Sequence, residues 1–149
     1  MLLYRHMKKV LKKENIEQIA SEIINKIFKN KNDKATIVTL SGDLGAGKTT
    51  LTKEIAKQLG VKGNIVSPTF VIMKIYKTKH IKFKKLIHLD AYRLNSDKEL
   101  LKIGWNELVE NKDNLILIEW PERVSGCFDN SQFKIEISHI DSETREIIF

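Results

Sequence analysis

The pattern of apolar and polar positions predicts an alternation of helices and strands. Residues 8–29 predict an amphipathic helix, entered near Lys13, because isoleucine recurs along one face at helical spacing. The residues of that stripe are Ile16, Ile19, Ile23 and Ile27, joined one step round by Ala20 and Ile24. Residues 35–40 are apolar and β-branched, which predicts a buried strand. Residues 50–59 carry a leucine or isoleucine at every fourth position and predict a second helix, which Gly60 ends.

The middle of the chain predicts two further strands joined by a basic connection. Residues 65–76 are rich in β-branched and aromatic residues and predict a strand that Pro68 interrupts. Because proline cannot donate to a strand ladder, we expect residues 67–69 at a sheet edge or in a loop. The lysine-rich stretch 77–85 predicts a hairpin-like connection, and residues 86–90 predict the next strand.

The last third combines short helices with strands of two kinds. Residues 96–99 run from a serine to a glutamate, which predicts a capping box at the start of a short helix, and residues 105–109 predict another helix. Residues 115–119 are four large apolar residues and a glutamate, a pattern typical of a strand buried on both faces. Residues 133–138 and 145–149 alternate apolar with polar positions, which predicts an antiparallel, half-exposed hairpin.

Together these elements predict an α/β fold, a mixed β-sheet flanked by helices with antiparallel C-terminal strands. The length of 149 residues favours one domain over residues 1–149. No apolar run approaches the roughly 18 residues of a membrane span, so we expect no membrane partner. Residues 1–7 show no secretory signal, and a single cysteine, Cys127, excludes an internal disulfide. These features predict a cytoplasmic protein.

The net charge of +7 raises the question of nucleic-acid binding, because clustered cations neutralise phosphates. Of the 26 basic residues only four are arginines, and lysine is abundant throughout. Runs of lysine usually form a solvated face, which is the interpretation we prefer. We leave open the alternative that these lysines make a weak electrostatic contact with tRNA.

Residues 41–50, Ser-Gly-Asp-Leu-Gly-Ala-Gly-Lys-Thr-Thr, match the P-loop pattern of nucleotide-binding proteins. Glycines let backbone N–H groups approach phosphate oxygens, and a helix that starts near Lys48 directs its positive end at the same oxygens. We expect Lys48 to reach the β- and γ-phosphates and the Thr49 hydroxyl to complete the shell of a Mg²⁺ ion. The order of strand, glycine loop and helix favours this interpretation over an ordinary glycine-rich turn.

Two carboxylates are candidates for managing the metal, because Asp90 and Glu119 each end a predicted strand. Open α/β sheets bind ligands at the carboxyl ends of their strands. Glu119 follows the more apolar strand, so we assign it to Mg²⁺ and assign Asp90 to the attacking water or the metal's water shell. The alternatives are a solvated strand end for Glu119 and a turn cap for Asp90.

Four blocks of sequence occur in order along the chain, namely the P-loop at 41–50, Ser-Pro-Thr-Phe at 67–70, His-Leu-Asp-Ala-Tyr-Arg-Leu at 88–94 and Glu-Trp-Pro-Glu at 119–122. Together they resemble the bacterial TsaE (YjeE) family, and the resemblance spans roughly residues 10–145. Members of this family are small ATPases of tRNA threonylcarbamoyladenosine (t6A) biosynthesis. The resemblance implies a P-loop NTPase-like fold and a Mg²⁺-dependent ATPase that is slow alone and stimulated by partners.

The resemblance also implies roles for individual residues. The residues that would bind the ATP phosphates are Asp43, Leu44, Gly45, Ala46, Gly47, Lys48, Thr49 and Thr50. Thr49 and Glu119 would ligate Mg²⁺, and Asp90 would be needed for hydrolysis together with Lys48 and Glu119. Thr69 lies in a loop that resembles a nucleotide-sensing switch and would reach the γ-phosphate or the metal.

Trp120, beside the metal residue, would shape the nucleotide pocket, with simple core packing as the alternative. One departure concerns the first helix, where Ile16 and Ala20 replace a threonine and a glycine common in the family. That segment is expected near the adenine, so the residues that recognise the base are not predicted.

By the same resemblance the partners are TsaD and TsaB, whose complex is reset by ATP hydrolysis. Two other functions are weighed against this one. A small P-loop nucleotide kinase would need a lid bearing several arginines, and the chain has only four arginines in all. A non-catalytic nucleotide-sensing, RNA-binding module would use bound ATP only as a switch.

Overall fold

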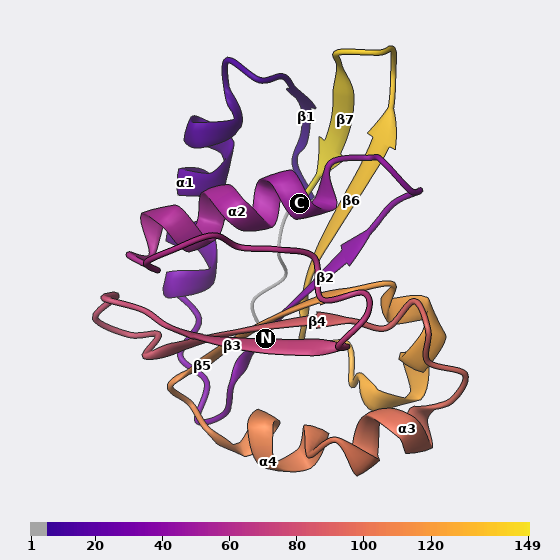
Figure 1. Ribbon diagram of the computed structural model, residues 1–149. Coiled ribbons are helices and arrows are strands. Elements are labelled where there is room, and N and C mark those ends of the chain that lie inside the picture. Colours follow the sequence, from indigo (N-terminus) through magenta and orange to yellow (C-terminus); the bar gives the residue numbers. More distant parts are fainter. Residues whose placement is uncertain (1–5) are drawn as a thin grey trace.

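A mixed sheet lies at the centre of the computed structural model, which describes residues 6–149 (Figure 1). Its strands are β1 (Lys8–Leu11), β2 (Thr36–Ser41), β3 (Met73–Lys77), β4 (Lys85–Asp90), β5 (Asn114–Glu119), β6 (Phe133–His139) and β7 (Arg145–Ile148). They follow the order β1-β7-β6-β2-β5-β4-β3 across the sheet. The segment in which no secretory signal was expected falls largely on residues 1–5, outside the described residues.

Helices cover both faces of the sheet and enclose two apolar cores. The helices α1 (Ile16–Phe28) and α2 (Lys48–Gln58) lie on one face, and α3 (Asp97–Lys102) and α4 (Trp105–Glu110) lie on the other (Figure 1). A 3₁₀ segment, η1 (Pro121–Cys127), packs beside α3. The predicted mixed sheet with flanking helices is confirmed. In the described part of the chain no helix has the length and apolar character needed to cross a bilayer.

Parallel pairing at the centre of the sheet brings several strand ends to one edge. β2 pairs in parallel with β5 and β6, and β5 pairs in parallel with β4. Every residue of β5 is buried, as its unbroken apolar run predicted. The register places Leu40 and Asp90 on either side of Glu119, so the ends of β2, β4 and β5 are level with one another. This edge is where an open α/β sheet binds ligands.

The prediction of a helix over 8–29 is wrong at its start. Residues 8–11 form the edge strand β1, which pairs antiparallel with β7 from the far end of the sequence. The Asn15 side chain closes the turn that follows, accepting from Lys12 N at 2.7 Å and donating to Val10 O at 2.8 Å. α1 begins only after this turn, and the isoleucine stripe then packs in the core as predicted.

The strand predicted over 65–76 is much shorter than expected. Only β3 is extended, and residues 65–72 form a loop, which agrees with the expectation for residues 67–69. The Pro68 carbonyl accepts from the backbone N–H groups of Val71 and Ile72, and Ile72 adopts a left-handed conformation with φ of 69°. A β-branched residue rarely takes this conformation, so the loop is held there by its contacts.

The C-terminal hairpin is confirmed, since β6 and β7 pair antiparallel. The Asp141 carboxylate accepts from Glu143 N and Thr144 N at the turn, and these hydrogen bonds lower the pKa of Asp141. The predicted capping box is wrong in detail. Ser96 is the N-cap of α3 without a side-chain capping bond, and the Glu99 carboxylate accepts instead from Asn95 N at 2.8 Å.

Candidate nucleotide site

The glycine loop after β2 turns the chain tightly into α2, which begins at Lys48. Gly42 has φ of 153°, and a Cβ there would lie 2.4 Å from the carbonyl oxygen of Ile137. Gly47 caps the helix with φ of 103°, a left-handed conformation that favours glycine. The sequence therefore needs glycine at both positions to place the start of α2 over the edge of the sheet. Backbone N–H groups at that helix start are free of helical partners and suit an anion.

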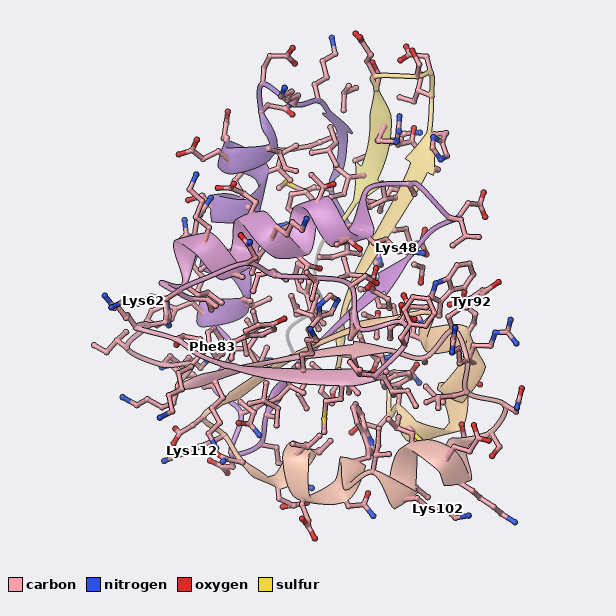
Figure 2. All side chains as sticks on the ribbon, viewed as in Figure 1. Lys48, Lys62, Phe83, Tyr92, Lys102 and Lys112 are labelled. Atoms are coloured by element: carbon pink, nitrogen blue, oxygen red, sulfur yellow. The ribbon has the colours of Figure 1, made fainter. Side chains whose placement is uncertain are left out.

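A cavity of about 270 Å³ opens between this helix start and the strand ends. Its lining combines the loop, the Thr69 segment and both strand-end carboxylates: Leu44, Gly45, Ala46, Gly47, Lys48, Thr49, Thr50, Ser67, Thr69, Asp90, Tyr92, Glu119 and Trp120. Every predicted site residue except Asp43 is in this set. Tyr92 is an addition, which its place two residues after Asp90 could have suggested. Lys48, the first residue of α2, and Tyr92 lie on the same side of the molecule in Figure 2.

Lys48 is buried, with 6% of its surface exposed, and forms part of the cavity lining. Nζ donates to the carbonyl oxygen of Gly42 and lies 4.0 Å from the centroid of the Trp120 ring. Burial lowers the pKa of Lys48 from its ordinary value of 10.5, against the attraction of Glu119, Glu122, Asp90 and Asp43. Asp43 thus acts on Lys48 through its charge although it does not line the cavity. A phosphate anion would relieve the desolvation of this cation.

The two strand-end carboxylates are neighbours, because Asp90 and Glu119 pair directly in the register of β4 and β5. They are 4% and 3% exposed. Asp90 accepts the Thr69 hydroxyl at 2.7 Å through Oδ2 and Tyr92 N at 2.9 Å through Oδ1. Glu119 Oε2 lies 2.9 Å from Nε2 of His88. Both carboxylates therefore have fixed orientations at the cavity.

The 65–72 loop is tied to Asp90 by the Thr69 hydroxyl and by the Ile72 carbonyl oxygen, which accepts from Asp90 N at 2.9 Å. Thr69 Oγ1 also lies 2.7 Å from Ser67 Oγ, so the hydroxyls of this loop and Asp90 form a short chain of hydrogen bonds. Phe70 and Val71, the next residues, are 80% and 58% exposed. The loop therefore has its polar contacts to Asp90 on one side and exposed apolar residues on the other.

Trp120 both lines the cavity and packs against the second apolar core. Its backbone is left-handed, with φ of 56°, at the turn between β5 and η1. The ring lies 5.1 Å from that of Tyr92, centroid to centroid, and against the Lys48 ammonium. The indole thus separates the lysine from solvent on one side.

The residues present fit a magnesium ion that arrives with a phosphate ligand. Mg²⁺ binds through one or two protein oxygens together with waters and phosphates, and a P-loop hydroxyl and one carboxylate are such donors. Thr49 and Glu119 both line the cavity. Within residues 6–149 no three His, Cys, Asp or Glu side chains gather as a ready metal site.

A second cavity of about 190 Å³ adjoins the first at the P-loop. The two share Ala46, Gly47 and Thr50. The remaining lining comes from the end of β1, the turn into α1, the first residue of α1 and the C-terminal hairpin, namely Leu11, Lys12, Lys13, Ile16, Glu143 and Arg145. A ligand with phosphates at Lys48 can therefore continue past Thr50 into a partly apolar space.

Comparison with known proteins identifies the family. The family model described as "Threonylcarbamoyl adenosine biosynthesis protein TsaE" matches residues 10–147. The chain belongs to the TsaE family. The resemblance stated on four sequence blocks is thereby confirmed, and with it the P-loop assignment of the fold. TsaE membership makes the chain an ATP-binding P-loop protein.

Individual TsaE proteins match over most of their length. The tRNA threonylcarbamoyladenosine biosynthesis protein TsaE of Haemophilus influenzae is 37% identical over 115 residues, which cover 77% of this chain and 70% of the relative. The TsaE of Streptomyces coelicolor is 42% identical over 110 residues, covering 74% and 73%. The crystal structure of YdiB from Bacillus subtilis matches with a TM-score of 0.72 at 29% identity, over 100% of this chain and 87% of that one.

Proposed function

We propose that this TsaE chain hydrolyses ATP with Mg²⁺ in the biosynthesis of threonylcarbamoyladenosine in tRNA. The observation that supports it best is the convergence of the P-loop, Asp90 and Glu119 on one cavity. Membership of the TsaE family supports the pathway. The cavity combines a buried cation, free helix N–H groups and two carboxylates, which suits a Mg²⁺-bound polyphosphate.

Each residue of the P-loop has a part in binding. Lys48 and the backbone N–H groups of 43–50 hold phosphate oxygens, and Lys48 leaves the Gly42 carbonyl to do so. Thr49 and Glu119 are the protein ligands of Mg²⁺, which, when bound, neutralises phosphate charge. Asp43 and Leu44 contribute to phosphate binding mainly through their backbone N–H groups.

Asp90 is the group that handles the attacking water. Each of its oxygens already accepts one hydrogen bond, from Thr69 and from Tyr92 N. A carboxylate has about four lone-pair positions, so capacity for a water proton is left. Fixed on both sides, Asp90 can orient that water without reorganising, while Thr69 lies where the transferred phosphoryl group would be sensed.

The nucleoside occupies the second cavity, beyond Thr50. Apolar contact from Leu11 and Ile16 suits a planar base, and Arg145 and the two lysines flank it. Recognition of adenine then depends on the β1–α1 turn and the C-terminal hairpin.

TsaD and TsaB are the partners, and their complex is reset when ATP is hydrolysed. The chain's own site contains Lys48 as its lining cation and no arginine among the residues of the first cavity. An arginine supplied from outside can raise phosphoryl-transfer rates by roughly 10³-fold or more. The isolated chain is therefore a slow ATPase that the partner complex stimulates.

The decisive experiment is steady-state phosphate release from ATP, with and without TsaD and TsaB. Wild-type chain should release phosphate slowly, faster with partners, and only with Mg²⁺. Glu119→Gln and Asp90→Ala should each abolish release, and Asp90→Ala should still bind ATP. Phosphorylated nucleotide products in place of free phosphate would instead indicate a kinase, and ATP binding without release would indicate a non-catalytic switch.

A further inference from the structure

His88 is a buried polar residue to which the proposed function gives no part. It is 0% exposed and lies in β4, two residues before Asp90. Its Nε2 lies 2.9 Å from Oε2 of Glu119. Its Nδ1 is buried and has no hydrogen-bond partner in residues 6–149. The imidazole thus has a single polar contact, and that contact is the proposed metal ligand.

The sheet neighbours of His88 are apolar residues together with Lys74, its pairing partner in β3. Because side chains alternate along a strand, Leu86, His88 and Asp90 project from the same face of β4. Leu86 belongs to the larger apolar core, as does Leu117, the residue that pairs with His88 across β5. An apolar side chain of similar size would satisfy packing here without leaving Nδ1 unpaired. Packing alone therefore does not account for a histidine.

The bond geometry defines the tautomer. A carboxylate of Glu119 can only accept, so the proton of the shared hydrogen bond lies on Nε2 of His88. A second proton on Nδ1 would be a buried donor without an acceptor, which is costly. The neutral imidazole protonated at Nε2 is the form that fits. Oε2 of Glu119 is then held by His88, which leaves Oε1 for an ion in the cavity that Glu119 lines.

We propose that His88 is a positioning residue for the metal ligand Glu119. Its Nε2–H holds the carboxylate in the orientation that presents Oε1 to Mg²⁺, in the way that outer hydrogen-bond partners commonly orient metal ligands. The inference rests on the proposed role of Glu119 in binding Mg²⁺. It adds a residue that never touches nucleotide or metal and yet sets how strongly the metal contributes.

The test measures the gain in ATP affinity on adding Mg²⁺, by titration calorimetry with and without EDTA, so that no turnover is needed. His88→Leu keeps the volume and removes the donor, and we expect the Mg²⁺-dependent gain to fall about 10-fold while Mg²⁺-free ATP affinity is retained. His88→Gln places an amide N–H near the position of Nε2 and should restore most of the gain. Leu86→Val, a change in the same apolar face, should leave the gain unchanged.

Two outcomes overturn the inference. One is a His88→Leu variant whose ATP affinity rises on adding Mg²⁺ as much as that of the wild type. The other is a His88→Leu variant that loses ATP affinity equally with and without Mg²⁺, which would indicate a role in packing. The Glu119→Gln variant distinguishes a failure of the His88 inference from a failure of the proposed function. If Glu119→Gln removes the gain and His88→Leu does not, only the role of His88 fails. If Glu119→Gln keeps the gain, the metal assignment itself fails.

A measurement on the wild-type chain keeps the inference testable if His88→Leu does not fold. Nitrogen-15 NMR distinguishes the two neutral tautomers of histidine, and the chain has four histidines to assign. We expect the His88 ring to carry its proton on Nε2 with Nδ1 unprotonated. A ring protonated on Nδ1 alone could not donate to Glu119, and the proposal would then be wrong.

Discussion

Lys48 is the residue at which binding and stability conflict. Its ammonium group is buried against Gly42 and Trp120 before any phosphate is present, and desolvation lowers its pKa. A lowered lysine pKa means that the charged form is less favourable in the folded protein than in the unfolded chain. The unliganded protein is therefore destabilised by this charge, and a bound polyphosphate removes that cost.

Replacing Lys48 with methionine should separate the two effects. Lys48→Met keeps the length of the side chain and removes the charge, so the free energy of unfolding of the unliganded protein should stay level or rise. ATP affinity should fall about 10- to 100-fold, the equivalent of one lost charge-assisted hydrogen bond. Thermal unfolding with and without ATP measures both. A destabilised apo protein with unchanged ATP affinity would contradict this view of Lys48.

The lowered pKa also predicts how ATP binding depends on pH. Lys48 binds phosphate in its protonated form, so affinity should decline as the pH rises through a pKa below 10.5. Over that range the unfolded chain holds the extra proton, so the stability of the unliganded protein should rise as the affinity falls. Lys48→Arg stays charged throughout and should flatten the affinity profile. A wild-type profile that is flat up to 10.5 would show that Lys48 titrates as a free lysine.

At the scale of single residues, the site was predictable where chemistry depends on local spacing. The P-loop residues and the two strand-end carboxylates follow from short motifs, and the structure brings them to one cavity. His88 and Tyr92 were not singled out, because their contacts depend on pairing between β4 and β5 and on a turn after β4. No spacing in the sequence predicts that His88 contacts Glu119, which lies 31 residues away along the chain.

Among the elements, the 65–72 loop is the one most directly coupled to chemistry. Thr69 anchors it to Asp90, and Ile72 holds a left-handed backbone conformation where the loop joins β3. Its β-branched composition predicted a strand, but Pro68 and the turn it nucleates prevail over propensity. The Thr69 hydroxyl is the side-chain part of this attachment, and a backbone bond from Asp90 N to Ile72 O holds the end of the loop. Losing the hydroxyl should therefore loosen the loop without unfolding the sheet.

Thr69→Val tests this anchor, since it preserves shape and removes the hydroxyl. We expect faster amide exchange across 65–72, at least about 10-fold slower phosphate release, and a loss of stability of only about 1 kcal/mol. Val71→Ala, at an exposed position of the same loop, serves as the control and should behave as wild type. Unchanged exchange in Thr69→Val would show that the loop is held by something else.

The β1 strand shows why the spacing of apolar residues wrongly predicted a helix over residues 8–11. Residues 8–11 have no pattern of their own that distinguishes strand from helix, and their partner β7 lies at the other end of the chain. The Asn15 turn is the local signal that separates the two elements, and it also borders the second cavity through Lys12 and Ile16. Such long-range pairing cannot be inferred from a window of a few residues.

Asn15→Ala should remove both side-chain hydrogen bonds of that turn. The residue is partly exposed, so we expect the free energy of unfolding to drop by about 1 kcal/mol, and ATP affinity to weaken because the second cavity loses its shape. Denaturant unfolding and ATP titration measure the two effects. Glu14→Ala, at the exposed neighbouring position, is the matched control, and an equal effect of both variants would count against the turn.

For the molecule as a whole, the sheet order explains where the site lies. Parallel strands β2, β5 and β4 end together, and the P-loop crosses above them into α2. The antiparallel hairpin of β6 and β7, with β1, extends the sheet on one side and supplies Arg145 to the second cavity. The sequence predicted the mixed sheet and its antiparallel end, whereas the strand order depends on contacts distant in sequence.

The most direct test of the account is a crystal structure of the chain with a non-hydrolysable ATP analogue and Mn²⁺ in place of Mg²⁺. The account predicts one anomalous peak within about 2.5 Å of both Thr49 Oγ1 and a Glu119 oxygen. It also predicts phosphate oxygens at Lys48 Nζ and a water that contacts Asp90. A manganese ion away from Glu119, or a triphosphate that does not follow residues 43–50, would contradict it.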